Sequence, residues 1–432
     1  MVTAAVLLAF VLVVRNRTLQ QDVEGDAATT AAIAHPQAAT VPVPHAHAGF
    51  LYGRITTVDG ATHEGRLRWG GDQEAFWSDH FNGAKDENPW AAHLPVDPSP
   101  FEIFGFKIGG QQPNLNRLFL ARFGDIARIE ARVWTVRVTL KSGTVVDLDR
   151  NATSDIDDGV RVWAAGPEAI DVDARRIRLI DFLPTAPLDF APTRLHGTVR
   201  ARKGDFTGFI QWDQQDSVGT DMLDGRSDVG ERRLRYDTIR SIARHSRDKA
   251  LVTLVDGREL VLSNSREFGP NNRGIHVDDR RYGRVLIPWD AFERVDFSPR
   301  DSSGPAYRDF PPGQPLTGSV TTHDGRRLAG RLVYDFDENE TTETFDAPFQ
   351  GVDYNIPFAL ITSIVPAARD GGGDQRGTLL LHSGEELPLD RDGDFGPRNL
   401  GLLVFVDGGE RPQYVPWTDV VRIDLDHPAN QS

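Results

Sequence analysis

The sequence predicts an all-β protein made of three tandem repeats, each with two small antiparallel barrel halves. Three observations lead to this prediction. Apolar residues alternate with period two in many short stretches, the pattern of strands with one buried face. The 41 glycines and 27 prolines are spread along the chain and favour tight turns. The same patterns recur three times, and long helical patterns are scarce.

The first half of each repeat opens on a predicted hairpin. The three hairpins begin at Leu51, Leu195 and Leu316, contain a glycine turn and end on an aromatic residue. An Ile-x-x-Ile strand follows after 27 residues in the second and third copies, but after 57 in the first. The first copy therefore carries an insertion near 84–118. We expect it to be a surface excursion whose rings, such as Trp90, cover a barrel mouth or meet a partner.

The second half of each repeat opens on a second hairpin with a Ser-Gly or Asp-Gly turn. It closes with a short turn and a strand, as in "VLIPWDAFERVDF" and "QYVPWTDVVRIDL". Pro288 and Pro416 cannot donate to a strand ladder, so each marks the end of a strand. We expect the next residues, Trp289 and Trp417, to be buried across the mouth of a barrel, with each ring nitrogen paired.

The patterns predict repeat 1 at residues 49–186, repeat 2 at 193–299 and repeat 3 at 313–428. A five-strand half with a long first hairpin and a one-turn 3₁₀ element before its last strand resembles the SH3-like or Sm-like small barrel. No residues here match the RNA-binding residues of the Sm family. The alternative architecture is three larger β-sandwich or barrel domains, in which the two halves of a repeat share one core.

The N-terminus predicts export or tethering. The 13 apolar residues of "VTAAVLLAFVLVV" place a signal sequence or short membrane anchor at residues 1–17. Residues 18–48, rich in Ala, Thr and Pro, read as a disordered linker. We therefore expect an extracytoplasmic protein, periplasmic or in the cell envelope, that meets a membrane only through this segment.

Composition and motifs exclude several functions. The net charge of −15, from 63 acidic and 48 basic residues, opposes nucleic-acid binding, which requires clustered cations. The absence of cysteine excludes disulfides and thiolate metal sites. The sequence contains neither a Gly-x-Ser-x-Gly nucleophile motif nor a glycine-rich phosphate loop with lysine. These observations favour a protein that is not an enzyme and carries no cofactor.

Acidic residues recur in the loop after the first hairpin. In repeat 2 they are Asp213, Asp216, Asp221 and Asp224. Carboxylates that converge on a turn are suitable ligands for Ca²⁺, although no twelve-residue calcium loop is present. The commoner role of acidic turn residues is to accept hydrogen bonds from their own backbone.

A Phe-Gly-Pro turn followed by Asn and Arg occurs in two repeats. The candidate ligand-binding residues are Asn271, Asn272, Arg273, Arg398 and Asn399. Such side chains can bind a carboxylate, a sugar or a partner backbone. They can equally satisfy the amides of their own loop, which is the structural interpretation.

Repeated copies with changing polar residues favour binding or scaffolding over a single active site. The leading hypothesis is a non-enzymatic protein of the cell envelope that binds a protein or a glycan. The alternatives are a glycan-active hydrolase with carboxylates in a cleft between repeats, and a Ca²⁺-stabilised structural module. A pair of carboxylates in a deep pocket, one with a raised pKa, distinguishes the hydrolase from the others.

Overall fold

The computed structural model describes residues 46–70, 72–94, 117–153, 157–164, 168–189, 191–264, 266–367, 376–406 and 408–426, with two short strands inside 102–107. Its regular elements are antiparallel strands and short 3₁₀ turns, so the predicted all-β fold is confirmed. Within these ranges no helix has the length and apolar character needed to cross a membrane. The predicted signal or anchor at 1–17, and the predicted linker at 18–48 as far as residue 45, lie outside the described residues.

The strands are short and follow one another at tight turns. Repeat 1 contains β1 (Tyr52–Thr57), β2 (Thr62–Trp69), β3 (His80–Ala84), η1 (Ala91–His93), β4 (Glu102–Ile103), β5 (Phe106–Lys107), β6 (Leu118–Arg122), η2 (Phe123–Asp125), β7 (Ile126–Ala131), β8 (Thr135–Leu140), β9 (Val145–Asp149), η3 (Arg150–Ala152), β10 (Val160–Trp163), β11 (Ile170–Val172), η4 (Ala174–Arg176) and β12 (Ile177–Phe182). Repeat 2 contains β13 (His196–Ala201), β14 (Gly204–Gln211), β15 (Met222–Ser227), β16 (Gly230–Arg235), η5 (Tyr236–Thr238), β17 (Ile239–Arg244), β18 (Lys249–Leu254), β19 (Glu259–Ser263), β20 (Ile275–Asp279), β21 (Gly283–Ile287) and β22 (Phe292–Phe297). After η6 (Tyr307–Asp309), repeat 3 contains β23 (Thr317–Thr322), β24 (Arg327–Tyr334), β25 (Thr344–Phe349), β26 (Val352–Pro357), η7 (Phe358–Leu360), β27 (Ile361–Val365), β28 (Arg376–Leu381), β29 (Glu386–Asp390), η8 (Gly393–Phe395), β30 (Leu402–Val406), β31 (Gln413–Val415), η9 (Trp417–Asp419) and β32 (Val420–Leu425).

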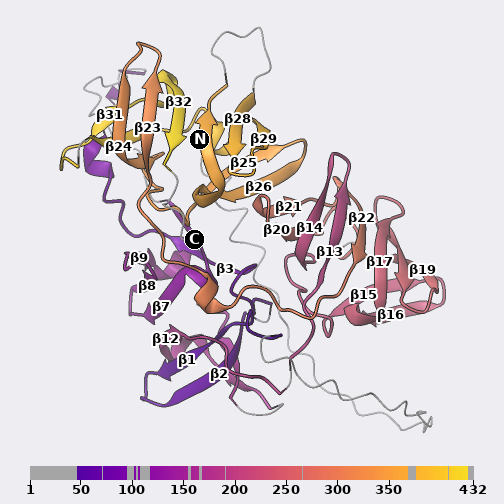
Figure 1. The fold of residues 1–432 in the computed structure, drawn as a ribbon. Helices are drawn as coiled ribbons and strands as arrows, with labels where there is room; N and C mark the ends of the chain where they lie inside the picture. Colours follow the sequence, from indigo (N-terminus) through magenta and orange to yellow (C-terminus); the bar gives the residue numbers. More distant parts are fainter. Residues whose placement is uncertain are drawn as a thin grey trace. The chain divides into compact units, whose positions relative to one another are not determined.

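Eight strands of each repeat follow one order, and many of them are labelled in Figure 1. In repeat 2 they are β19-β18-β17-β22-β13-β14-β20-β21, and the corresponding strands of repeats 1 and 3 are β9-β8-β7-β12-β1-β2-β10-β11 and β29-β28-β27-β32-β23-β24-β30-β31. The first hairpin, β13–β14, pairs with β22 and β20 from the second half of its repeat. The loop 212–221 carries the chain away from β14, so the next hairpin joins β19 at the other end. The hydrogen bonding therefore does not divide at the boundary between the predicted halves.

The two closing strands of each repeat lie side by side at its centre. They are β7 with β12, β17 with β22, and β27 with β32. Each pair aligns two apolar residues that are fully buried, and burial of such a side chain contributes roughly 1.5–3 kcal/mol. The facing residues are Ile129 and Ile180, Ile242 and Val295, and Ile364 and Ile423.

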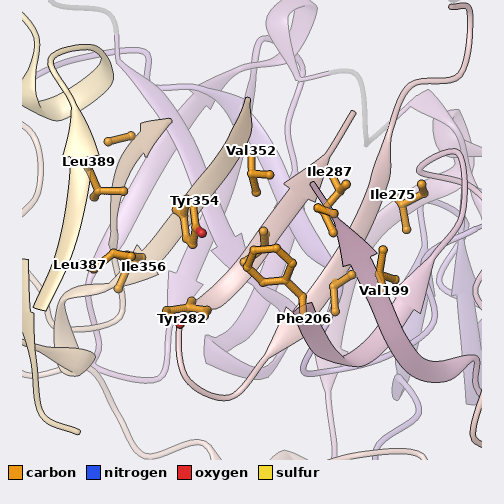
Figure 2. Close-up of a cluster of buried hydrophobic side chains, with 14 of the residues drawn as sticks. Val199, Phe206, Ile275, Tyr282, Ile287, Val352, Tyr354, Ile356, Leu387 and Leu389 are labelled. Atoms are coloured by element: carbon orange, nitrogen blue, oxygen red, sulfur yellow. The ribbon is translucent and has the colours of Figure 1, made fainter. Parts of the chain in front are cut away.

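Repeats 2 and 3 share a continuous twelve-stranded sheet because β21 pairs with β26, with Val285 opposite Tyr354. The core continues across this junction, as Figure 2 shows. Phe206, Tyr282 and Tyr354 form three edge-to-face contacts with ring centroids 5.5 to 6.1 Å apart. Aromatic packing of this kind stabilises the junction beyond the area that it buries.

The insertion of repeat 1 lies in the loop of the β3–β6 hairpin, whose counterparts β15–β16 and β25–β26 have two-residue turns. Its described beginning contacts repeat 3. Lys85 Nζ lies 2.5 Å from Asp337 Oδ1, and the ring of Trp90 lies 6.0 Å from that of Phe405. Trp90 is only half-buried, and the partner that it meets belongs to the same chain.

The segment between repeats 2 and 3 packs on repeat 1. Tyr307 and Phe310 are buried in the core of repeat 1, and the Tyr307 hydroxyl donates to the Ile126 carbonyl at 2.8 Å. Phe310 lies so close to Gly124 that a Cβ there would be 2.5 Å from its ring. Glycine is therefore required at position 124. Because of these contacts, the three repeats surround a common cavity.

The two Pro-Trp residues have different environments. Trp289 is 2% exposed, and its Nε1 donates to the Arg247 carbonyl at 2.8 Å, in agreement with the sequence interpretation. Its ring stacks on Phe292 with centroids 5.3 Å apart. Trp417 is only half-buried, which differs from the expectation. The residue at the position of Phe292 in repeat 3 is Val420, and the second indole instead contacts the rings of Tyr334 and Phe395, with centroids 5.8 and 6.4 Å apart.

Candidate functional site

A cavity of about 1330 Å³ lies where the three repeats meet. Repeat 1 contributes Trp77 and Arg122, repeat 2 contributes β13, β14 and β20, and repeat 3 contributes Pro357 and the last two residues of η7. The linker around Phe310 completes the wall. We call this space the central cavity. Its volume exceeds that of an ordinary small-molecule pocket, which suits an extended ligand.

Four arginines and four aspartates line the central cavity. Arg280 and Arg300 are exposed, and neither makes an ion pair with any residue that the structure describes. Arg281 differs, because its guanidinium is held 2.7 Å from Asp279. Arg122 is likewise held by Asp125 at 2.7 Å. Two arginine side chains thus remain available to an anionic ligand in a protein that is acidic overall.

Aromatic rings also line the central cavity, and the Arg122 guanidinium lies over two of them, 5.1 Å from the ring centre of Trp77 and 5.5 Å from that of Phe310. Trp77 and Phe310 lie with ring centroids 6.0 Å apart, and Phe209 is 9% exposed. Thr198 and Thr207 are hydrogen bonded to each other at 2.8 Å beside Phe209 and add hydroxyl groups to the lining. Apolar faces with a few placed polar groups are typical of ligand sites.

Asp278 on β20 is the unusual residue of the cavity. It is 4% exposed, and its Oδ2 has no hydrogen-bond partner among the described residues. Burial raises the pKa of Asp278 to about 8, although Arg284 opposes the shift. The side chain is therefore protonated at neutral pH, and it can donate a hydrogen bond to a ligand.

The neighbouring Asp279 behaves in the opposite way. Burial disfavours its charge, but hydrogen bonds from the Arg281 side chain and from the Arg281 and Thr207 amides lower its pKa. Asp279 is therefore ionised, and both of its oxygens already accept hydrogen bonds from Arg281 or Thr207. The cavity thus combines one protonated and one ionised carboxyl group on consecutive residues of β20.

The position of Asp278 is a departure from the repeat pattern. Asp278 faces Phe209 across the β14–β20 ladder. In repeat 1 the equivalent pair is Arg66 and Trp163, with the guanidinium carbon 3.7 Å from the ring centre. In repeat 3 it is Arg331 over Phe405, at 3.8 Å. Repeat 2 therefore replaces the cross-strand cation–π pair by an aromatic residue and an acid, both of which line the central cavity. The cation over the Phe209 ring is Arg194 from outside this strand pair, 4.6 Å from the ring centre.

Sequence reasoning missed this site, although a signal was present. The segment after the glycine reads "GIHVDDRR" in repeat 2, "GVRVWAA" in repeat 1 and "GLLVFVD" in repeat 3. Four consecutive charged residues, Asp278 to Arg281, therefore end this segment only in repeat 2. A position-by-position comparison of the copies would have singled out Asp278.

The four calcium candidates are bonded to the protein itself. Asp221 Oδ2 accepts from the Ser217 and Val218 amides at 3.0 and 3.1 Å, and Asp213 Oδ1 accepts from the Arg273 amide at 2.6 Å. Asp216 accepts from the Tyr236 hydroxyl, and Asp224 accepts from Arg233. Over the described ranges, no group of three or more His, Cys, Asp or Glu residues is arranged to hold a metal ion.

The capping role of Asp221 recurs in the other repeats. Asp79 Oδ2 accepts from the Glu74 and Ala75 amides at 2.7 and 2.8 Å. Glu343 Oε2 accepts from the Asn339 and Glu340 amides at 2.5 and 2.9 Å. A carboxylate at this position therefore organises the same loop three times, which accounts for the acidic residues there.

The Gly-Pro loops are also internally bonded. Asn272 Oδ1 accepts from the Gly274 amide at 2.9 Å, and Asn399 Oδ1 accepts from the Gly401 amide at 2.7 Å. Asn399 is buried and also donates to the Tyr334 hydroxyl. These contacts support the structural interpretation for both asparagines.

The remaining loop candidates lie on the surface. Asn271, Arg273 and Arg398 are exposed, and Arg273 contacts Asp213. None of the five loop candidates lines the central cavity. No protein family, curated protein or solved structure matches this chain.

Proposed function

We propose that this chain is a non-enzymatic binding protein of the cell envelope, and that its ligand is an acidic glycan held in the central cavity. The replacement of the cation–π pair by Phe209 and Asp278 carries this proposal, because it changes the cavity wall in one repeat only. The other two repeats act as a scaffold that completes the cavity.

Each part of the cavity suits one part of such a ligand. The unpaired guanidinium groups of Arg280 and Arg300 suit a sugar carboxylate, since arginine binds carboxylates through two parallel hydrogen bonds. The partly exposed ring of Trp77 suits the apolar face of a pyranose. The protonated Asp278 suits a ring or hydroxyl oxygen. Export or tethering through the N-terminal segment would place the protein where such glycans occur.

Binding is tested by calorimetry with acidic and neutral oligosaccharides of equal length. We expect the acidic oligosaccharide to bind, and the double variant Arg280→Ala, Arg300→Ala to bind it at least about tenfold more weakly, because charge-assisted hydrogen bonds are lost. The matched control is Arg258→Ala, Arg326→Ala, which removes two exposed arginines away from the cavity. Equal weakening in both double variants would contradict the proposal.

A second candidate is a glycan-active hydrolase, and one observation favours it. Asp278 has a raised pKa and Asp279 a lowered pKa in one cavity, as expected of an acid and its anionic partner. However, Asp279 is occupied by Arg281 and by the Thr207 amide. Incubation of the wild type and Asp278→Asn with the bound oligosaccharide separates the two functions. Cleavage by the wild type alone would establish the hydrolase, and an intact oligosaccharide would exclude it.

A further inference from the structure

A second cavity, of about 400 Å³, lies between repeats 1 and 3. It is bordered by the start of the insertion from Lys85 to Trp90, by the β8–β9 hairpin and by the loop that follows β24. We call it the acidic pocket. It shares only Thr342 with the lining of the central cavity.

Two buried carboxylates of the acidic pocket have an oxygen without a partner. Glu340 is 6% exposed, and its Oε1 accepts from the hydroxyls of Ser142 and Thr144. Asp125 is 4% exposed, and its Oδ2 accepts from Arg122 Nε at 2.7 Å. Glu340 Oε2 and Asp125 Oδ1 find no hydrogen-bond partner among the described residues. Buried carboxylate oxygens are costly to leave unpaired, so these two atoms indicate a missing donor.

The rest of the lining is strongly negative. Five further acidic residues line the acidic pocket: Asp86, Glu87, Asp147, Asp337 and Glu343. Lys85 is its one cationic lining residue in the part of the chain that the structure describes, and it is already bound to Asp337 at 2.5 Å and to Glu343 at 3.6 Å. A cation supplied from outside would provide the missing donor and offset this negative charge.

The chemistry of the walls identifies the class of cation. The described residues offer no group of acidic or histidine side chains arranged for a metal ion, which argues against Ca²⁺ or Mg²⁺ here. Trp90, Phe119 and Leu140 give the pocket apolar surface. An ammonium group on an apolar stem matches both features, because its N–H groups can reach the carboxylates while its methylene groups lie on the rings.

We propose that the acidic pocket binds an alkylammonium cation of the diamine or polyamine class. The ammonium group donates to Glu340 Oε2 and Asp125 Oδ1, and the stem lies against Trp90. This site is independent of the glycan proposed for the central cavity, and either proposal can fail without the other.

The test is titration calorimetry of the full chain with 1,5-diaminopentane, and with 1,5-pentanediol as a neutral molecule of the same length. We expect the diamine to bind and the diol to give no heat of binding. Glu340→Gln keeps the acceptor for Ser142 and Thr144 but removes the charge. We expect it to weaken diamine binding at least about tenfold, the loss typical of a charge-assisted hydrogen bond. Asp125→Asn should act in the same way.

The matched control is Glu231→Gln on β16, which removes the same charge from a residue whose side chain is 83% exposed. Its affinity for the diamine should equal that of the wild type. The proposal is overturned if the diamine does not bind, if the diol binds equally, or if Glu231→Gln weakens binding as much as Glu340→Gln. If Glu340→Gln or Asp125→Asn fails to fold, the site is tested by tryptophan fluorescence of the wild type and of Trp90→Phe. The diamine must then change the fluorescence of the wild type but not that of Trp90→Phe, and equal changes refute the site.

Discussion

Replacement of Asp278 by asparagine should make the protein less sensitive to alkaline pH. Asparagine has nearly the same shape as aspartic acid but never ionises. Asp278 is buried in the folded protein, and burial raises its pKa to about 8, whereas the ordinary pKa of an aspartate side chain is 3.8. Between these two values the folded protein holds a proton on Asp278 that the unfolded chain has released.

The sign of the effect follows from this difference. Because the folded state binds the extra proton, the Asp278 contribution to the free energy of unfolding is largest below pH 4 and falls as the pH rises toward 8. Each pH unit in this window costs the wild type about 1.4 kcal/mol. Asp278→Asn has no such dependence. The free energy of unfolding of Asp278→Asn minus that of the wild type should therefore increase by about 3 kcal/mol from pH 5 to pH 7.5.

Urea unfolding of both proteins at several pH values measures this gain. Other buried acids with raised pKa values, such as Glu267 and Asp216, affect both proteins equally and cancel in the difference. Asp279→Asn is the control with the opposite sign. It removes a carboxylate of lowered pKa, so its loss of stability should be greatest at neutral pH and should shrink in acid. A constant difference between the wild type and Asp278→Asn across this range would refute the assignment of a buried, protonated Asp278.

Three further predictions concern packing and buried polar contacts. Trp289→Ala should lower the free energy of unfolding by about 3–5 kcal/mol because it leaves a cavity. Trp417→Ala should lower it by less than half as much, because that ring is half-buried. Urea unfolding measures both losses, and equal losses would contradict the structure. Lys85→Met leaves Asp337 buried without its cation and should cost about 3 kcal/mol or more, which a double-mutant cycle with Asp337→Asn can verify through recovery of stability. Asn399→Ala should cost about 1–3 kcal/mol by leaving the Gly401 amide unpaired, and a thermal melt that matches the wild type would argue against this role.

Local patterns predicted the strands well, because a strand with one buried face is defined by its own sequence. The Ile-x-x-Ile motifs lie on central strands, and Ile129, Ile242 and Ile364 are fully buried as their spacing indicated. The difference between Trp289 and Trp417 was not predicted, because both follow a proline and precede the same apolar pattern, whereas the exposure of a ring depends on its neighbours in the fold.

Pairing between distant strands could not be predicted in this way. Nothing local to β14 specifies that Phe209 faces Asp278 rather than a residue of the next hairpin. The central cavity depends on that pairing and on the docking of Phe310 against Gly124, both of which join segments far apart in the sequence. The acidic residues of the loops stand out in the sequence because they recur in each repeat. Asp278 points to the cavity because repeats 1 and 3 have no acid at its position.

Within each repeat, the first hairpin pairs with strands from the second half. This pairing also determines when the fold can form. Val199 on β13 finds its partner Val295 on β22 only after the whole repeat has been synthesised. The strands from β15 to β19, in contrast, are contiguous and can pair as soon as they emerge. Until β20 and β22 arrive, the hairpin β13–β14 exposes two open edges, a state prone to pairing with other chains. Slow folding dominated by long-range pairing is therefore expected, with the first hairpin of each repeat as the segment that most needs protection during synthesis.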